Sequence, residues 1–308
     1  MELRVEYLGG SGFLVSLADA GFLFDCSEKG NDPRMLPEPE TLSSFSRLYF
    51  FATSAREDHF SPEALSRCGE KAQAFFPVEI PESYEGRRLS VGESAEADGV
   101  LVTAYPSTDE GISFMVETEG ICLFHAGTLN LWHWRDISSI AEIEEADRSF
   151  NECLKTIPRD KIDLAFFPVD PRQGSMYDAG AGAFVMSIRP KILIPMQFQG
   201  RADAARYFSV TNETNRTKIP VLEAPGNSVV FTFGRPEEAK PQEDEAQKDK
   251  SQETEEIQEQ LSEQTEGTEE LPKNPSEEPS EEISSEHTPE EATSPEKTEA
   301  SDPEASYE

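Results

Sequence analysis

The sequence predicts an α/β domain of four layers, two β-sheets face to face with helices outside them, followed by an acidic tail that does not fold. Up to residue 236, short apolar runs alternate with turn signals, and two β-rich halves each end in helices. The charge distribution marks the boundary, because residues 237–308 hold 26 of the 61 acidic residues but only 5 lysines. We therefore expect a folded domain over 1–236 and a tail over 237–308.

The amino-terminal half is predicted to be mostly β-structure. Strands are expected at 3–8, 12–17 and 21–24, and the run LYFFA at 48–52 has the composition of a buried strand. Ser61-Pro62-Glu63 is typical of a helix start, with Ser as the cap and Pro at the first helical position. Further strands are predicted at 74–76, 87–91, 100–105, 113–117 and 121–124.

The second half is expected to carry most of the helices. A long helix over 137–157 is predicted from apolar residues that fall mostly on one face, namely Ile137, Ile140, Ile143, Phe150, Leu154 and Ile157. Shorter helices are expected at 179–188 and 202–208, and strands at 162–167, 191–195 and 228–233.

Composition excludes several classes of function. The formal net charge of −34 opposes binding to nucleic-acid backbones and to anionic membranes, and no apolar run reaches the roughly 18–20 residues of a membrane helix. The four cysteines lack the spacing of a zinc site or a disulfide framework and are predicted to be reduced thiols that are buried or half-buried. Since the start MELRVEYLGGSGF also lacks an apolar leader, we expect a cytoplasmic protein without nucleic-acid or membrane partners.

The tail is rich in Glu, Ser, Thr, Pro and Gln. Such a segment cannot bury enough apolar surface to offset its ordering entropy, so it is predicted to be disordered. We interpret it as a solubilising, charge-repelling appendage, with binding of a protein partner as the alternative.

The segment TSAREDHF at 53–60 directly follows a buried strand, which is where sites of α/β proteins tend to lie. Other motifs accompany it in order: YLGGSGFLV at 7–15, LFDC at 23–26, LFHAGTLNLWHW at 123–134, AFFPVDPR at 165–172 and ILIPMQFQ at 192–199. With these motifs the chain resembles the metallo-β-lactamase superfamily, and within it small hydrolases similar to the L-ascorbate-6-phosphate lactonase branch. The resemblance spans about residues 1–233 and implies an αββα sandwich with metal ions at one edge, between the two sheets.

The family's chemistry depends on clustered His and Asp residues. They hold one or two Zn²⁺, or Mn²⁺ or Fe, and the metal lowers the pKa of a bound water to near ~7. This chain has other residues at five positions of the pattern, namely Gly10, Ser54, Arg56, Thr128 and Gln197, and it has no counterpart of the family's additional metal histidine between Tyr105 and Asp109. Of the expected ligands only Asp58 and His59 remain, too few for a catalytic metal, and the Arg56 guanidinium would repel one. We therefore expect no cofactor, with one Zn or Mn ion as the alternative.

Asp58 and His59 are the candidate catalytic residues and the residual metal candidates. They are interpreted first as structural, with Asp58 paired to Arg56. They could also be partial metal ligands together with Asp109 or Glu110, or a metal-free acid–base pair. Arg56 is expected either to form a salt bridge with Asp58 or Glu57, or to replace the charge of the metal and hold a phosphate or carboxylate.

The candidate ligand-binding residues are Arg56, Asp109, His125, Thr128, Trp132, His133 and Gln197. Trp132 and His133 are predicted to line a pocket mouth or to pack ordinarily, and His125 to be structural. Gln197 is expected to hydrogen-bond Asp58. For Asp170 and Arg172 we expect a local ion pair, with substrate binding as the alternative.

Two functional hypotheses follow from these residues. The leading one is a hydrolase-like protein that has lost metal-dependent hydrolysis and binds a small anionic metabolite or a protein. The alternative is an active metallo-hydrolase with a rearranged mononuclear site that acts on phosphorylated or lactone-like small molecules. Whether the chain is an enzyme stays open at this point.

Overall fold

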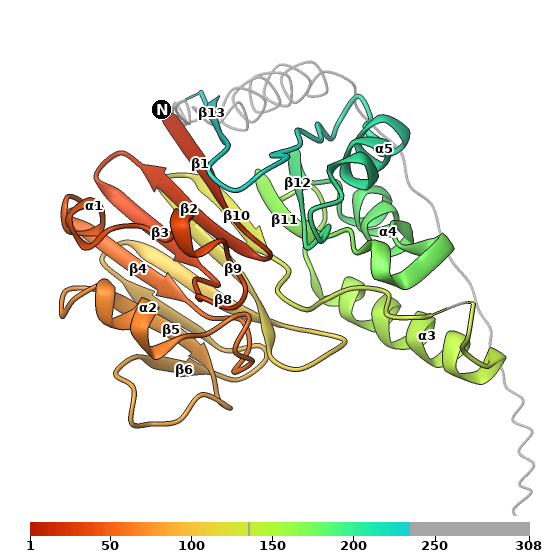
Figure 1. Ribbon diagram of the computed structural model, residues 1–308, viewed down its shortest axis with the longest axis horizontal. Coiled ribbons are helices and arrows are strands. Elements are labelled where there is room, and N and C mark those ends of the chain that lie inside the picture. Colours follow the sequence, from red (N-terminus) through yellow and green to blue (C-terminus); the bar gives the residue numbers. More distant parts are fainter. Residues whose placement is uncertain (135, 235–308) are drawn as a thin grey trace, which may run out of the picture. The chain divides into compact units, whose positions relative to one another are not determined.

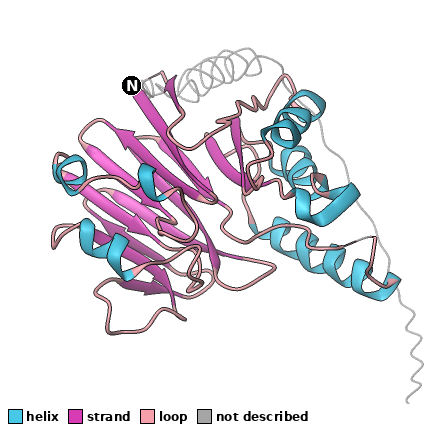
Figure 2. Cartoon of the chain, viewed as in Figure 1, coloured by secondary structure: helices cyan, strands magenta, loops and turns pink. Residues whose placement is uncertain are grey.

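Two β-sheets pack face to face in the computed structural model, which describes residues 1–134 and 136–234 (Figure 1). Helices α1 and α2 cover the outer face of one sheet, and α3, α4 and α5 lie on the other side (Figure 2). The structure thus has the predicted αββα architecture. The predicted tail over 237–308 lies outside the described residues.

The first sheet has seven strands in the order β13-β1-β2-β3-β4-β5-β6. Its strands β1 to β3 and β13 are antiparallel, whereas β3 to β6 pair in parallel. Their bounds are β1 Glu2–Gly9, β2 Gly12–Leu17, β3 Ala20–Phe24, β4 Arg47–Phe51, β5 Gln73–Pro77, β6 Arg87–Leu89 and β13 Ser228–Thr232. The short helices are α1 Pro39–Ser43 and α2 Pro62–Arg67, with a 3₁₀ turn at Pro33–Met35.

The second sheet has six strands in the order β12-β11-β10-β9-β8-β7. Their bounds are β7 Ser94–Ala97, β8 Val100–Pro106, β9 Ile112–Thr118, β10 Ile121–His125, β11 Leu164–Pro168 and β12 Ile192–Met196. Strands β10 to β12 are parallel and are connected through α3 Ile140–Thr156 and α4 Ala179–Ile188. Helix α5 Ala202–Asn212 follows β12, and a 3₁₀ helix, Pro171–Met176, follows β11.

Aromatic side chains fill the space between the two sheets. Phe13 of β2 stacks on Phe166 of β11 with ring centroids 4.2 Å apart, and Phe24 of β3 stacks on Phe51 of β4 at 4.6 Å. All four rings are fully buried. A separate apolar cluster, which includes Leu23 and Phe50, lies on the other face of the first sheet, under α1 and α2. Burial on both faces explains why the central strands are continuously apolar.

The structure corrects the start of the long helix. The prediction placed it at 137, but α3 begins after Ser139, whose side chain and that of Glu142 form a capping box. Ile137 and Ile140 are 85% and 76% exposed, so the apolar face begins later in the helix and buries Phe150, Cys153 and Leu154. Strand β7, helix α1 and both 3₁₀ segments were not predicted.

The structure bears on two features predicted from the composition, the cysteines and membrane-spanning segments. All four cysteines are buried and none is in a disulfide, as predicted. Among the described residues, no helix has both the length and the apolar character needed to cross a membrane.

Candidate functional site

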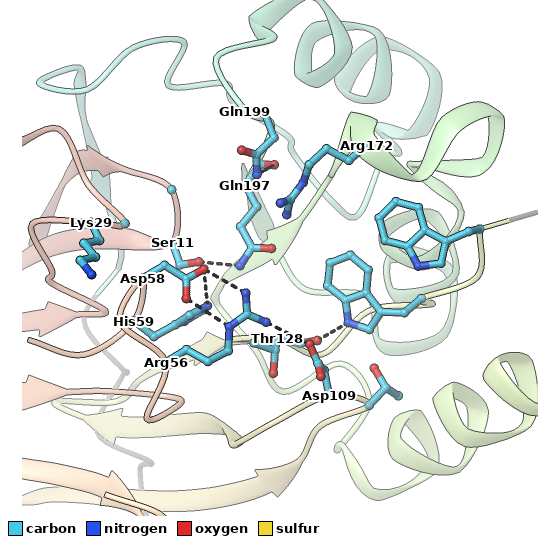
Figure 3. A pocket seen from close by; sticks show the side chains of 15 residues that line it. Ser11, Lys29, Arg56, Asp58, His59, Asp109, Thr128, Arg172, Gln197 and Gln199 are labelled. Atoms are coloured by element: carbon cyan, nitrogen blue, oxygen red, sulfur yellow. Dashed lines mark hydrogen bonds and ion pairs between the residues drawn. The ribbon is translucent and has the colours of Figure 1, made fainter. Parts of the chain in front are cut away.

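A cavity of about 460 Å³ opens at the edge where strands of both sheets end (Figure 3). Its lining follows the carboxyl ends of β1, β3, β4, β8, β10, β11 and β12. Seven of the predicted site residues line it, namely Arg56, Asp58, His59, Asp109, Thr128, Trp132 and Gln197. Seven further lining residues were not among the predicted site residues, namely Gly10, Ser11, Lys29, Gly30, Thr108, Trp134 and Gln199, and Arg172 was predicted to bind substrate only as an alternative.

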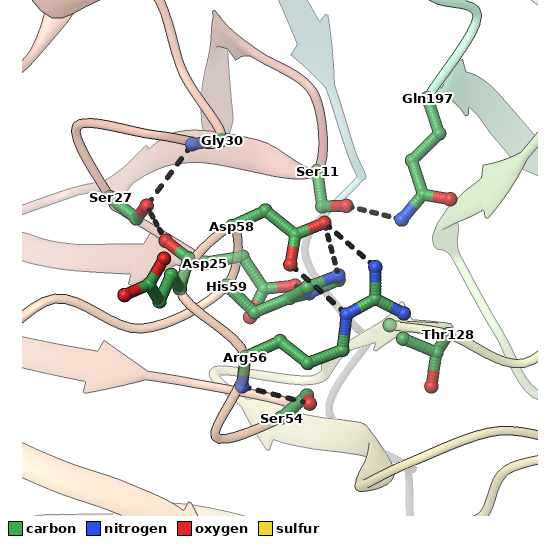
Figure 4. A network of polar contacts seen from close by, with 12 residues as sticks. Ser11, Asp25, Ser27, Gly30, Ser54, Arg56, Asp58, His59, Thr128 and Gln197 are labelled. Atoms are coloured by element: carbon green, nitrogen blue, oxygen red, sulfur yellow. Dashed lines mark hydrogen bonds and ion pairs between the residues drawn. The ribbon is translucent and has the colours of Figure 1, made fainter.

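Beneath the cavity lies a buried network centred on Asp25, a residue that was not predicted to belong to the site. Strands β3 and β4 are parallel neighbours, so the residues that follow them meet at the same edge. The Asp25 carboxylate accepts from the Thr53 backbone N–H at 2.8 Å and from the Thr53 hydroxyl. Figure 4 shows Asp25 next to the His59 ring. It also lies 2.7 Å from His59 Nδ1. The motif LFDC was the sequence signal for Asp25, but its partners depend on this pairing of strands.

The Asp25–His59 pair stabilises its own charges. Burial disfavours the ionised form of both groups, but their mutual attraction outweighs it, so the pKa of Asp25 is lowered and that of His59 is raised. His59 Nε2 lies 3.8 Å from the Asp58 carboxylate at the cavity wall. Asp25 therefore fixes the orientation of the His59 ring toward Asp58.

Arg56 spans two carboxylates in the cavity. Its Nε and Nη2 donate to the two Asp58 oxygens at 3.1 and 3.2 Å, and its Nη1 donates to Asp109 at 3.2 Å. The structure therefore shows the predicted ion pair with Asp58, whereas Glu57 pairs with Lys29 instead. Of the three carboxylates that were considered as metal ligands, Asp58 and Asp109 are bound to this guanidinium, and Glu110 is not.

His125 and His133 are not brought into the cavity. His125 is fully buried, its Nε2 is 2.8 Å from the Ser11 carbonyl oxygen, and its ring stacks on Phe24 at 5.1 Å. Burial lowers the pKa of His125, which favours the neutral ring. His133 is buried outside the cavity lining. This packing agrees with the structural role predicted for His125. Neither histidine lines the cavity, so the structure does not bring these two candidate ligand-binding residues to it.

Gln197 also has a different partner from the predicted one. Its Nε2 donates to the Ser11 hydroxyl at 2.6 Å, not to Asp58. Nearby, Gly10 has φ +54°, and a Cβ there would lie 2.2 Å from the Gly30 carbonyl oxygen. The histidine that the family motif has at this position therefore does not fit the local backbone of this chain.

The segment after β11 forms the predicted local ion pair. Asp170 is fully buried, and its two carboxylate oxygens lie 3.0 and 2.9 Å from Arg172 Nε. Arg172 extends from this pair into the cavity lining (Figure 3). The motif PVDPR signalled the pair, but only the packing of β11 against the cavity shows that Arg172 faces a ligand space.

The donor set of the cavity does not fit the metal centre that the fold implies. Ser54 is buried, with its hydroxyl accepting from the Arg56 backbone N–H, and Thr128 donates to the Glu110 carbonyl oxygen at 2.7 Å. Gln197 and Arg56 occupy two further ligand positions with an amide and a guanidinium. Over 1–134 and 136–234, no three His, Cys, Asp or Glu side chains are grouped to hold a metal ion.

Comparisons with known proteins agree with the fold. No protein-family model matches the chain. A UPF0173 metal-dependent hydrolase from Opitutus terrae is 24% identical over 260 residues, which cover 74% of this chain and 99% of the relative. The structure is similar to that of Igni18, a metallo hydrolase from the archaeon Ignicoccus hospitalis, with a TM-score of 0.57 and 21% identity. That match covers 76% of this chain and 100% of Igni18.

Proposed function

We propose that this chain, which shares its fold with metallo-β-lactamase-like hydrolases, is a hydrolase-like protein that has lost metal-dependent hydrolysis and binds a small anionic metabolite. The ligand site is the cavity at the shared edge of the two sheets. The alternative of a rearranged mononuclear hydrolase uses the same cavity, so one experiment separates the two.

The observation that carries the proposal is the position of Arg56. Its guanidinium is always protonated and is bound to Asp58 and Asp109, two carboxylates that line the cavity. A divalent cation would have to displace this bound charge, and the like charges repel each other at short range. The side chain thus supplies a fixed positive charge where the family has a metal ion.

Anion binding is supported by the cationic side chains that line the cavity. Lys29, Arg56 and Arg172 approach it from three different loops. Arginine binds carboxylates and phosphates through paired N–H donors, and a partly enclosed site strengthens such contacts. The folded part as a whole is acidic, with 35 acidic against 22 basic residues over 1–236, whereas the cavity lining itself has these three cations against two carboxylates, Asp58 and Asp109.

Metal content tests the proposal directly. The full chain is purified after growth with added Zn²⁺, Mn²⁺ and Fe²⁺, and bound metal is measured by mass spectrometry. We expect well below one metal per wild-type chain, and more in an Arg56→Ala variant, which removes the competing charge. An Arg201→Ala variant is the control, because Arg201 forms an exposed pair with Asp203 outside the cavity. One tightly held metal per wild-type chain, lost on Asp58→Asn, would refute the proposal and support the mononuclear hydrolase.

A further inference from the structure

We infer that Arg172, oriented by the buried carboxylate of Asp170, is the anion-binding residue of the cavity, and that its ligand is a ring-bearing monocarboxylate. This inference rests on the proposed function, because it names the ligand class of the same cavity. It is carried by the geometry of two arginine pairs, by the balance of charge in the cavity, and by the two tryptophans that line it.

Arg172 is held in place on one edge of its guanidinium. Nε and Nη2 both bond the carboxylate of Asp170, which also accepts from the Arg172 backbone N–H at 3.0 Å. The opposite edge, formed by Nη1 and Nη2, carries N–H donors with the spacing that a carboxylate needs for two parallel hydrogen bonds. Among the described residues, none accepts a hydrogen bond from Nη1. Figure 3 shows the guanidinium in the cavity, near Gln197 and Gln199.

Arg56 differs from Arg172, because carboxylates within the cavity already neutralise its charge. All three of its guanidinium nitrogens donate to Asp58 or Asp109. A ligand anion at Arg56 would have to approach these two carboxylates closely. The donor edge of Arg172 faces the cavity instead, with its own partner Asp170 buried behind it.

The charge balance favours a ligand with a single negative charge. Three cationic side chains line the cavity, and four carboxylates line it or pair with these cations, namely Glu57, Asp58, Asp109 and Asp170. The local sum is therefore slightly negative. A phosphate ester with nearly two charges is repelled about twice as strongly by this surplus as a carboxylate. Two parallel hydrogen bonds from the Arg172 guanidinium can still bind a monoanion despite this small excess of negative charge.

Two indole rings supply the surface for a ring on the ligand. Trp132 is fixed by a hydrogen bond from its Nε1 to the Thr128 carbonyl oxygen at 2.7 Å, and Trp134 is 38% exposed at the cavity. Flat apolar walls next to a few oriented polar groups are typical of sites for small ring compounds. These are the two tryptophans of the sequence, so the intrinsic fluorescence of the protein reports on the cavity.

The test uses benzoate, acetate and inorganic phosphate as probes for the full chain, at one pH and one ionic strength. Binding is measured by isothermal titration calorimetry and by the change in tryptophan emission. We expect benzoate to bind at least about tenfold more tightly than acetate or phosphate, since acetate lacks the ring and phosphate carries more charge. No benzoate binding, or phosphate binding as tight as that of benzoate, would overturn the inference.

Variants then locate the anion contact. Arg172→Gln is expected to weaken benzoate binding about tenfold or more, and Arg172→Lys to fall between it and the wild type, because lysine keeps the charge without the fork. Arg201→Gln is the matched control. Arg201 bonds Asp203 through the same Nε and Nη2 edge and is exposed to a similar degree, 61% against 59% for Arg172, but it lies outside the cavity. We expect this control to bind benzoate like the wild type.

The outcomes separate this inference from the proposed function. Equal benzoate binding by Arg172→Gln and Arg201→Gln would overturn the inference. Loss of binding on Arg56→Gln but not on Arg172→Gln would also overturn it, while anion binding itself would stand. The metal measurement decides the proposed function independently of any probe. If circular dichroism shows that Arg172→Gln does not fold, Arg172→Lys alone is compared with the wild type. Wild-type affinity for benzoate in Arg172→Lys would then refute the role of the paired guanidinium donors.

Discussion

Asp25→Asn removes the charge at the centre of the buried network beneath the cavity. Asp25 is fully buried and accepts hydrogen bonds from both donors of Thr53, with His59 at 2.7 Å. Removing one partner of a buried, hydrogen-bonded charge pair costs about 3–5 kcal/mol, because the other groups are left without a matched partner. For a domain of this size that corresponds to a fall in Tm of roughly 6–20 °C.

The assay is urea unfolding of the full chain at pH 7, followed by tryptophan fluorescence. Asp203→Asn serves as the control, because it removes a carboxylate of an exposed pair with Arg201, and such pairs contribute little. We expect Asp25→Asn to lower the free energy of unfolding far more than this control does. A loss in the free energy of unfolding below about 1 kcal/mol would show that the network does not hold together the segments that follow β3 and β4.

The pH dependence of the same comparison follows from the two pKa shifts. The pKa of Asp25 is lowered, so its contribution is present above the ordinary carboxyl range near ~4 and is lost as pH falls through the folded-state value. The pKa of His59 is raised, so the contribution of its charge is complete below ~6.5 and is lost as pH rises through the folded-state value. The difference in the free energy of unfolding between wild type and Asp25→Asn should therefore be largest between pH ~4 and ~6.5, and smaller at lower and at higher pH.

Two further predictions concern the backbone around the site. Gly10→Ala should destabilise the domain by more than the about 1–3 kcal/mol of a left-handed residue, because the added Cβ would also meet the Gly30 carbonyl oxygen at 2.2 Å. Gly99→Ala is the control, with φ +78° and open space around the Cβ, and equal losses in thermal unfolding would contradict the clash. Ser139→Ala should cost about 1 kcal/mol by removing the cap of α3. The neighbouring Ser138→Ala, which leaves that cap intact, should change the unfolding midpoint much less, and equal shifts would argue against the capping box.

Local patterns predicted most of the strands but not the short edge elements. Strands such as β2 and β4 are recognisable because their continuous apolar runs are buried in the sheets. Strand β7 has the sequence SAEA and is mostly exposed, so no apolar signal marks it, and it forms because β8 offers an edge to pair with. The start of α3 shows the reverse case. Apolar spacing predicted a helix from Ile137, but the capping box of Ser139 and Glu142 begins it at Ile140, and Ile137 is exposed.

The candidate site was predicted through the resemblance of its motifs to those of a known family, and the contacts of its side chains were only partly predictable. Arg56 and Asp58 are two residues apart, so their ion pair could be anticipated from the sequence. The bond from Gln197 to Ser11 joins residues 186 positions apart, and no local rule selects that partner over Asp58. His125 likewise lies in a recognisable motif, LFHAGTLNLWHW, but the surroundings of its side chain depend on the position of β10 between β9 and β11.

From the sequence alone, local patterns indicated a layered α/β fold, and the resemblance to a known family implied that several ligand positions of its metal site carry other residues here. The tertiary structure decided which groups meet. It placed Asp25 under His59, Arg56 between Asp58 and Asp109, and Arg172 at the cavity in front of the buried Asp170. The physical reason is that the carboxyl ends of seven strands from two sheets converge at one edge. Which ends become neighbours depends on strand order and sheet packing, which no local pattern encodes.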